Sequence, residues 1–346
     1  MKKTFYIIWF LLFVFSIFVV VGGKIRPVGK KFIYKISGSG DLYSFSIIDD
    51  YKENYEAKKW TRNEYSLDSA SVITLGDSFF NTRIDSFTFP RELADRIHYG
   101  VYYFSNFVDD GLLNPIVYFR NANYKPGKRK VLVLETVERY AVNRMQAYDT
   151  MYNVRDYSTL ERIEIKLLKN EDLEYFFRNN ILIKPLSKII KKYRYKFFGE
   201  IDNRIAYYSK DPKMLFYEEA VNSNKREKTE ESLVQYADKI MDMSKKLKLE
   251  YNIDLVYMII PNKFTIYYDY MNIIYNYDQF IPRMQKLLAA RGVQYIDVYS
   301  EFINYRKNSD LKLLYYVGDT HYSAFGKEIV VNATVRKINK LLEEAK

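Results

Sequence analysis

Residues 71–80 read Ser-Val-Ile-Thr-Leu-Gly-Asp-Ser-Phe-Phe, a short apolar run that breaks at Gly-Asp-Ser. Such a run predicts a buried strand that enters a tight turn, with a helix beginning beyond it. Gly76 permits the close backbone approach that this turn needs. The turn would present the Ser78 hydroxyl at the carboxyl end of a sheet, where α/β folds place ligands. The alternative is a plain strand exit with a helix cap, because all three residue types favour turns and caps.

A second motif lies near the other end of the chain, where residues 316–326 read Tyr-Val-Gly-Asp-Thr-His-Tyr-Ser-Ala-Phe-Gly. A serine nucleophile needs a base, and the base needs a carboxylate that fixes its tautomer. The sequence holds only two histidines, and His321 follows Asp319 by two residues. We therefore predict Ser78 as nucleophile, His321 as base and Asp319 as its orienting carboxylate. The alternative is that Asp319 caps the next helix and His321 is a surface residue.

Together, Gly-Asp-Ser-Phe at 76–79 and Asp-Thr-His-Tyr at 319–322 resemble the SGNH (GDSL-type) hydrolase superfamily. The most similar branch is the SGNH-like O-acetyltransferases of the alginate O-acetylation type, whose signatures are Gly-Asp-Ser and Asp-x-His-Trp. Residues 135–139, Glu-Thr-Val-Glu-Arg, resemble the Glu-Arg element of that branch. Pro-Asn-Lys at 261–263, with Tyr267, resembles its Pro-x-Lys…Tyr element.

The chain departs from this branch in three ways. Its Asp-x-His motif follows the serine, whereas it precedes the serine in the alginate enzymes. The cyclic order of the four segments is the same, so a circular permutation would reconcile the two orders. Tyr322 stands where tryptophan is usual, and the sequence has no Gly-x-Asn-Asp block. A more distant resemblance is to the D-alanyl transfer protein of teichoic-acid modification, which shares the N-terminal anchor and the serine-first order.

The resemblance implies serine-dependent acyl transfer without a cofactor. The default oxyanion donor is the backbone N–H of Ser78 or Phe79, and Asp77 is expected to shape the turn. Arg139, carried over from the Glu-Arg element, is either a charged donor or an ion-paired strand end. Three further candidates for the substrate pocket come from the matched motifs: Lys263, Tyr267 and Tyr322. The alternative for Lys263 is an ordinary loop lysine that is solvated and has no role at the site.

Strands and helices alternate in the matched regions, as in α/β proteins with a mostly parallel sheet and helices on both faces. Apolar runs predict strands at 101–104, 130–135, 254–260 and 293–298, and helical spacing predicts helices at 227–250, 278–291 and 324–344. The fold class is therefore α/β, and the resemblance implies an SGNH-hydrolase-like (flavodoxin-like) three-layer sandwich. We place the catalytic domain at 71–346, with a mostly helical insertion at about 150–225.

The N-terminus is strongly apolar from residue 4 to residue 23 and carries no small-x-small cleavage motif. About 20 helical residues span roughly 30 Å, the thickness of a bilayer core. We expect residues 1–23 to be a signal anchor with one transmembrane helix in the cytoplasmic membrane, followed by a juxtamembrane connector at 24–70. By analogy with the resembling families, the catalytic domain lies outside the cytoplasm, in the periplasm or at the cell surface.

The predicted insertion interleaves basic and aromatic residues, as in Lys-Lys-Tyr-Arg-Tyr-Lys-Phe-Phe at 191–198. This composition suits a lid over the site or a segment against the membrane, with anionic head groups or a glycan as ligand. The alternative is a helical subdomain with an ordinary solvated face.

Composition limits the remaining function classes. The 346 residues carry 54 Lys and Arg against 43 Asp and Glu, a net charge of +11, but no compact basic motif points to nucleic acid. Cysteine is absent, and with two histidines a zinc site is not expected, so we predict neither a metal nor a cofactor. The expected partners are a cell-envelope polysaccharide or glycan as acceptor and a multi-spanning membrane O-acyltransferase as acyl source. A carbohydrate O-acyl esterase and a non-catalytic envelope assembly or binding protein are the alternatives.

Overall fold

The computed structural model describes residues 2–24, 40–53, 65–81, 88–104, 112–148, 183–225, 228–271, 273–309 and 311–343. The chain divides into two compact units. The larger unit comprises Gly38–Val154 and Asp202–Lys346, and the smaller one comprises Met1–Ser37 and Arg155–Ile201. The two parts of the larger unit are thus far apart in sequence but fold together.

The larger unit is built on a five-stranded sheet with the order β2-β1-β3-β6-β7. All four strand pairs are parallel. The strands are β1 (Val72–Leu75), β2 (Val101–Tyr103), β3 (Lys130–Val137), β6 (Ile253–Ile260) and β7 (Gln294–Ile296). This is the doubly wound, flavodoxin-like order, in which ligands bind at the carboxyl ends of the strands where the order reverses, here beside β1 and β3. The predicted parallel α/β sheet is confirmed.

Alternate residues of the strands supply two separate hydrophobic cores. In β3, Val131 and Val133 face one core, whereas Leu132 and Leu134 face the other. All eight residues of β3 are buried, as expected for a central parallel strand covered on both faces. The sheet is therefore the middle layer of three.

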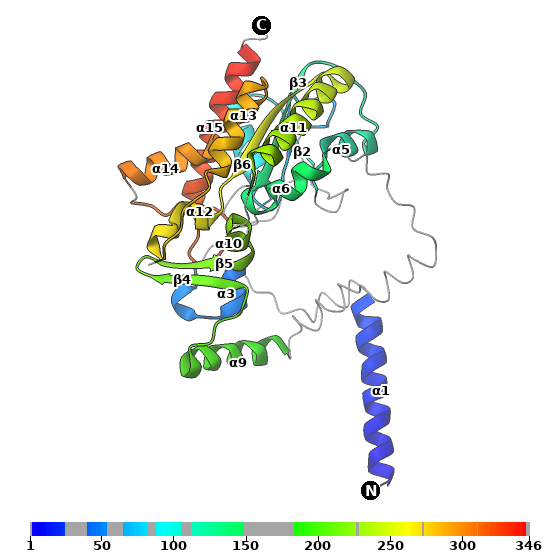
Figure 1. The fold of residues 1–346 in the computed structure, drawn as a ribbon. Helices are drawn as coiled ribbons and strands as arrows, with labels where there is room; N and C mark the ends of the chain where they lie inside the picture. Colours follow the sequence, from blue (N-terminus) through cyan, green and yellow to red (C-terminus); the bar gives the residue numbers. More distant parts are fainter. Residues whose placement is uncertain are drawn as a thin grey trace. The chain divides into compact units, whose positions relative to one another are not determined.

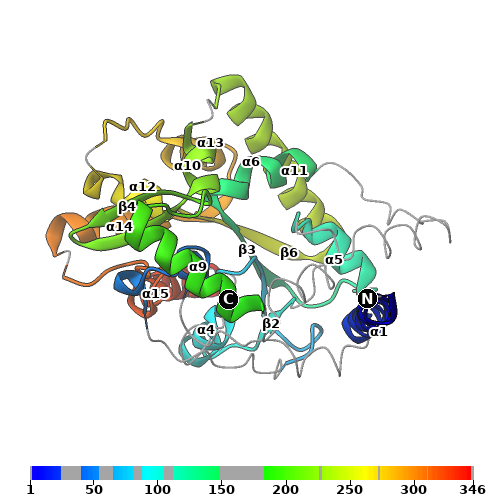
Figure 2. The ribbon, with the colours of Figure 1, turned by 90° about the horizontal axis from the view of Figure 1, so that it is seen from below.

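Helices cover both faces of this sheet, as Figure 2 shows for α4 and α15 on one side of β3 and β6 and for α6 and α11 on the other. The first core is closed by α4 (Phe89–Ile97), α14 (Val298–Asn308) and α15 (Ala324–Glu343). The second is closed by α5 (Pro115–Asn121), α6 (Glu138–Ala147), α11 (Glu230–Tyr251) and α13 (Phe280–Ala290).

Helix ends follow local capping chemistry. The Thr229 side chain accepts a hydrogen bond from the N–H of Ser232 and caps the start of α11; Asn252, the residue after the helix, lies in the left-handed region with φ 55°. The Asp297 carboxylate likewise caps α14 through the N–H of Ser300 at 2.9 Å. Of the helix predicted after the serine, the structure describes α4, which begins at Phe89 next to Pro90; residues 82–87 lie outside the described residues.

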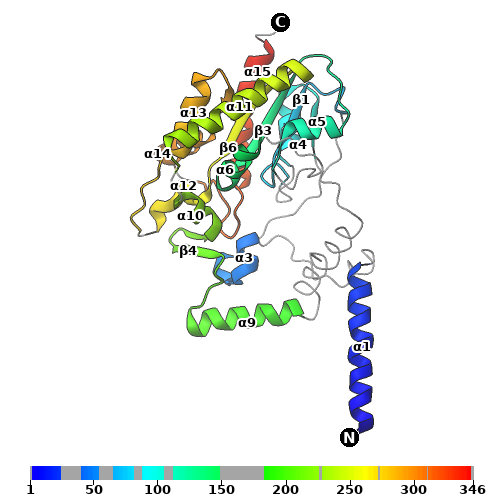
Figure 3. The same ribbon diagram turned by 45° about the vertical axis from the view of Figure 1, so that its right-hand side comes forward.

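Two segments lie nearer the site than the sequence indicates. The predicted connector contains α3 (Asp41–Ser46) and a 3-10 helix, η1 (Asp49–Tyr51), which belong to the larger unit. The predicted helical insertion contains an antiparallel hairpin of β4 (Ile205–Lys210) and β5 (Lys213–Tyr217), followed by α10 (Glu218–Lys225). Figure 3 shows α3 beside β4. Two short elements complete the unit, α12 (Lys263–Tyr267) and a 3-10 helix, η2 (Tyr268–Tyr270).

The smaller unit contributes two described helices, α1 (Lys2–Lys24) and α9 (Ile183–Phe198), both visible in Figure 1. The side chains of α1 are described as far as Val14. Among the residues that the structure describes, no helix has the length and apolar character needed to cross a membrane. The transmembrane helix predicted within residues 1–23 is therefore not supported by the structure.

Candidate active site

Ser78 lies in the turn that directly follows β1, and its side chain is exposed although Asp77 and Phe79 beside it are buried. The turn is tight because Gly76 leaves no room for a side chain. A Cβ at Gly76 would lie 2.6 Å from Oε2 of Glu135 and 2.6 Å from the ring of Phe80. The Gly-Asp-Ser motif therefore lifts the hydroxyl to the carboxyl end of the sheet, as predicted.

The buried side chain of Asp77 stabilises this turn through hydrogen bonds. Its Oδ1 accepts the N–H of Phe79 at 2.9 Å, and its Oδ2 accepts the N–H of Val137 at 3.3 Å and a guanidinium N–H of Arg144 at 2.8 Å. Burial would raise the pKa of Asp77, but the charge of Arg144, the Phe79 hydrogen bond and Arg139 outweigh it and lower the pKa. These effects favour the ionised form of Asp77, whose hydrogen bonds join the serine turn to β3 and α6.

Glu135 is a second buried carboxyl under the same turn. Its Oε2 accepts the N–H of Asp77 at 2.7 Å, and its side chain is fully buried. Burial and the neighbouring charge of Asp77 raise its pKa well above the ordinary value. These effects favour the protonated form of Glu135, and the Arg144 guanidinium pairs with Asp77 at 2.8 Å.

His321 connects the two sequence motifs. Its Nε2 lies 2.8 Å from Oγ of Ser78, and its Nδ1 lies 2.6 Å from Oδ1 of Asp319. An ionised carboxylate can only accept, so Nδ1 carries the proton and Nε2 accepts the serine hydroxyl. The predicted contact between Ser78 and His321 is present, over a separation of 243 residues.

Electrostatics supports this tautomer. Burial opposes the ionisation of Asp319, but the charge and hydrogen bonds of His321 and the N–H of Asp41 outweigh it and lower the pKa of Asp319. Burial also opposes protonation of His321, yet the attraction and hydrogen bond of Asp319 raise the pKa of the imidazole. The pair thus favours a carboxylate that stabilises an imidazolium, which a general base becomes during reaction.

Asp41 is a further residue at this site that sequence reasoning missed. Its backbone N–H donates to Oδ2 of Asp319 at 2.9 Å. Its carboxylate accepts the N–H of Thr320 at 2.8 Å and the hydroxyl of Thr320 at 2.5 Å. The preceding Gly40 has φ 87°, and a Cβ there would collide with the carbonyl of Gly318. The start of α3 therefore fixes the turn that carries His321.

Lys263 is a buried lysine and not a solvated loop residue. It is buried, and its ammonium donates to the carbonyls of Leu215 at 2.8 Å, Val317 at 3.0 Å and Asp319 at 2.8 Å. Burial lowers its pKa to about 8, although nearby carboxylates, Glu53 foremost, act in the opposite direction. Lys263 therefore ties the hairpin to the turn that holds the His321–Asp319 pair.

Two predicted pocket tyrosines are also buried. The Tyr322 hydroxyl donates to the carbonyl of Phe79, and its ring lies 5.1 Å from the Phe79 ring, centroid to centroid. The Tyr267 hydroxyl accepts the N–H of Leu314 at 2.8 Å. Both side chains are at most 2% exposed. Tyr322 thus supports the serine turn from inside the domain, and Tyr267 supports the chain before the histidine.

Of the three candidate oxyanion donors, the N–H of Phe79 is already occupied, whereas the N–H of Ser78 and the guanidinium of Arg139 remain candidates. The N–H of Phe79 already donates to Asp77, so it is not free to bind an oxyanion. Among the described residues, the N–H of Ser78 makes no hydrogen bond. Arg139 is half-buried, makes no ion pair within the described ranges, and its guanidinium lies 5.8 Å from the Phe79 ring centroid. Its positive charge also acts to lower the pKa of His321.

Three side chains at the site could in principle hold a cation, because ligand atoms of Asp41, Asp319 and His321 lie within 4.8 Å of one another. Each carboxylate oxygen involved already accepts a hydrogen bond. A metal ion would have to replace these hydrogen bonds and the Nδ1 proton. The donor set therefore fits a hydrogen-bonded relay better than a metal centre.

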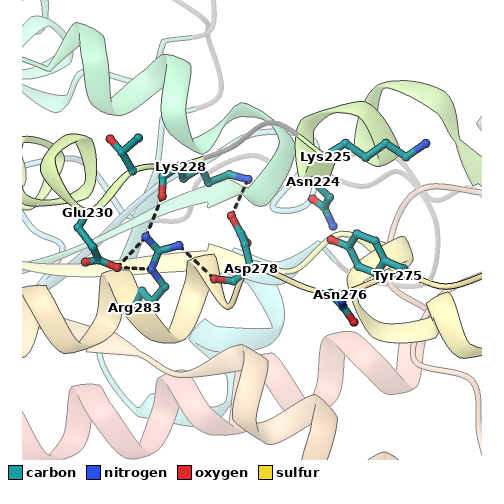
Figure 4. Close-up of a pocket in the computed structure, with 9 residues that line it drawn as sticks. Asn224, Lys225, Lys228, Glu230, Tyr275, Asn276, Asp278 and Arg283 are labelled. Atoms are coloured by element: carbon teal, nitrogen blue, oxygen red, sulfur yellow. Dashed lines mark hydrogen bonds and ion pairs between the residues drawn. The ribbon is translucent and has the colours of Figure 1, made fainter.

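A cavity of about 640 Å³ lies at the junction of α10 and α11 (Figure 4). Four of its charged groups form two ion pairs, Lys228 with Asp278 at 3.4 Å and Arg283 with Glu230 at 2.7 Å. None of the predicted site residues lines it. The lining residues are Asn224, Lys225, Lys228, Thr229, Glu230, Tyr275, Asn276, Asp278 and Arg283.

The fold and the site together define the class. A parallel doubly wound sheet presents a serine after its first strand, and a histidine–aspartate pair from the loop before the last helix reaches that serine. Such an arrangement can take the proton of a serine hydroxyl and return it to a leaving group. The larger unit is thus an α/β domain with a hydrogen-bonded serine–histidine–aspartate group at the carboxyl end of its parallel sheet.

Comparison with known families agrees with this class. Residues 211–346 match a family model described as an SGNH hydrolase-like domain, acetyltransferase AlgX. The matched range contains Lys263, Tyr267, Asp319 and His321, but it begins after Ser78 and covers less than half of the chain. No curated protein matches the chain. The C-terminal part of the chain is therefore similar to this acetyltransferase family.

Proposed function

We propose that the chain transfers acyl groups through Ser78. The observation that carries the proposal is the hydrogen-bonded series Ser78–His321–Asp319. Oγ of Ser78 attacks the acyl carbonyl while Nε2 of His321 takes its proton, and the resulting imidazolium gives that proton to the departing alcohol. An acceptor hydroxyl then attacks the acyl-serine in the same way and releases Ser78.

Two groups are proposed to stabilise the oxyanion of the tetrahedral intermediate. The N–H of Ser78 is the backbone donor, because the N–H of Phe79 is occupied by Asp77. Arg139 supplies a charged donor whose Nε has no hydrogen-bond partner among the described residues. A donor that is already in place when charge develops costs little reorganisation at the moment of reaction.

We further propose O-acetylation of a cell-envelope polysaccharide, with a multi-spanning membrane O-acyltransferase as acyl source. The support is the similarity of residues 211–346 to an acetyltransferase family, together with the two motifs. Water as acceptor would make the same site a carbohydrate O-acyl esterase, because both reactions share the acyl-serine. A non-catalytic envelope protein is the alternative from another class.

Hydrolysis of p-nitrophenyl acetate tests the proposal. Ser78→Ala and His321→Ala should each lose most of the rate, and the double variant should lose little more, because the pair acts as one unit. An oligosaccharide acceptor should then gain acetyl groups, detected by mass spectrometry, if the protein is a transferase. Turnover that is unchanged in Ser78→Ala contradicts the mechanism. Turnover that depends on Ser78 but never acetylates a sugar favours the esterase.

The location is proposed from the sequence alone. Residues 4–23 are apolar and uncharged, and we propose that they hold the catalytic unit at the outer face of the cytoplasmic membrane. A protease added to intact spheroplasts should then remove a C-terminal tag. A protected tag, or a soluble product that lacks about 25 N-terminal residues, would rule out this topology.

A further inference from the structure

Helix α9 (Ile183–Phe198) carries an apolar surface that the described part of the chain leaves open. Five of its apolar side chains are between 52% and 66% exposed: Leu186, Ile189, Ile190, Tyr193 and Phe197. A helix of a water-soluble domain normally turns such residues toward a core. The exposed surface of α9 therefore calls for a partner.

These five residues form one stripe along the helix. Successive members are separated by three, one, three and four residues, which keeps them on one face at 3.6 residues per turn. The rings of Tyr193 and Phe197 stack on this face, with centroids 5.7 Å apart and planes inclined by 7°. The stripe is a continuous apolar surface rather than a set of single exposed side chains.

The charge on the helix has one sign only. From Leu186 to Phe198 it contains five basic residues and no acidic residue, the five being Lys188, Lys191, Lys192, Arg194 and Lys196. Arg194 pairs with Glu200 just beyond the helix end, and Lys196 lies 5.8 Å from the Phe197 ring centroid. A partner of α9 should therefore combine an apolar interior with a negatively charged surface.

We propose that α9 lies in the plane of an anionic bilayer surface, with the stripe in the acyl–headgroup boundary and the basic residues among the head groups. A basic amphipathic helix with aromatic and aliphatic residues on its other face has the features of interfacial helices. Each basic side chain adds attraction to anionic lipids. A hydrated glycan would satisfy the charges but would leave the aliphatic part of the stripe uncovered. This inference does not depend on the catalytic proposal.

Site-specific fluorescence on the full chain tests the proposal. The chain contains no cysteine, so Ile190→Cys on the stripe and Lys188→Cys on the opposite face each give a single labelling position. Each variant is labelled with an environment-sensitive dye and reconstituted into vesicles of phosphatidylcholine, with or without phosphatidylglycerol. Matched thermal unfolding midpoints for the two labelled chains show that neither label disturbs the fold.

With phosphatidylglycerol at low salt, we expect the dye at 190 to shift to the blue and to be quenched several-fold more by spin-labelled acyl chains than the dye at 188. High salt, or Lys191→Glu with Lys192→Glu, should reduce this difference because the attraction is screened or removed. Equal quenching by aqueous iodide at both positions in all vesicles would overturn the proposal. Shielding of 190 without lipid quenching would show a protein partner, and shielding only with added oligosaccharide would show a glycan; either result also overturns it.

Discussion

At the scale of single residues, the site depends on which groups around Ser78 are already occupied. The Gly-Asp-Ser motif predicts the position of the Ser78 hydroxyl at the end of β1. It does not indicate which neighbouring backbone N–H is available to bind an oxyanion. Asp77 takes the N–H of Phe79, a contact between residues two positions apart. A local side-chain contact of this kind is common for Asp in turns and could have been anticipated. It leaves the N–H of Ser78 as the backbone candidate for the oxyanion.

The Asp319–His321 contact predicts a particular pH dependence. The pKa of His321 is raised above its ordinary value of about 6.5, and only neutral imidazole can act as the base. Activity should therefore rise with pH, with a midpoint above 6.5. Asp319→Asn removes the main group that raises this pKa, so the midpoint should move to lower pH while the plateau rate falls, by roughly 10⁴-fold if the tautomer is lost.

The pH–rate profiles of the parent and of Asp319→Asn for an activated acetate ester check this expectation. The same linkage acts on stability. The contribution of His321 to the free energy of unfolding is fully present below the unfolded pKa and is lost as pH rises through the higher folded pKa. A pH–rate midpoint of Asp319→Asn that equals that of the parent, or that lies at higher pH, would show that Asp319 does not raise the pKa of His321.

Gly76→Ala should damage the serine turn. The new methyl group would lie 2.6 Å from Glu135 and from the Phe80 ring, so either the strand exit or these side chains must move. We expect a loss of about 1–3 kcal/mol in the free energy of unfolding and a large loss of activity. Gly127→Ala is the matched control, because a Cβ there meets no atom within 4 Å. Urea unfolding compares the two; equal stability would mean that Gly76 is not constrained by space.

At the scale of elements, α3 is the part of the site that the sequence could not show. Its contacts with the turn that carries His321 join residues 278 and 279 positions apart, and no motif in the segment points to them. Polar residues after an apolar terminus look like a linker when only composition is considered. The burial of Lys263 is equally hidden in the sequence, because its three carbonyl partners come from β5 and from the loop before α15.

Asp41→Asn tests whether α3 positions the histidine. The variant removes the charge that Thr320 contacts, and an amide nitrogen cannot accept the threonine hydrogen bonds. Because the charge of Asp41 also raises the pKa of His321, the midpoint of the pH profile should move down. Charge-assisted bonds contribute about 1.5–3 kcal/mol, so the rate should fall by roughly ten- to a hundredfold if the turn loosens.

The control for this variant is Asp50→Asn, whose side chain is 69% exposed and, among the described residues, forms an ion pair with Lys213 at 4.0 Å. It should leave both the rate and the pH midpoint within error of the parent. A fall in rate for Asp41→Asn without any movement of the pH midpoint would indicate a general packing defect. The positioning role of Asp41 would then be wrong.

The regular elements were predictable where periodicity was long and uniform. The apolar runs at β3 and β6 and the helical spacing of α11, α13 and α15 gave the predicted elements within a few residues. The hairpin of β4 and β5 was predicted as helix, because its strands of six and five residues are short and rich in lysine and tyrosine. For such strands the tertiary packing, here on α3 and α12, decides the structure.

At the scale of the whole molecule, the two ends of the chain combine to make one site. Ser78 follows β1, His321 precedes α15, and Arg139 lies in α6 directly after β3. The serine–histidine contact therefore lies at the end of the sheet where the strand order reverses, beside β1 and β3. The similarity to the acetyltransferase family covers only the C-terminal contribution. The geometry links this part to a serine that the family match does not reach.

A serine-reactive fluorophosphonate probe tests the central claim most directly, because it labels only an activated hydroxyl and needs no knowledge of the natural acceptor. We predict one modified residue, Ser78, located by peptide mass spectrometry. The labelling rate should fall sharply in His321→Ala and should follow the raised pKa of His321 in the parent. Labelling that spares Ser78, or that proceeds equally fast in His321→Ala, would contradict an acyl-transfer site built on this serine–histidine contact.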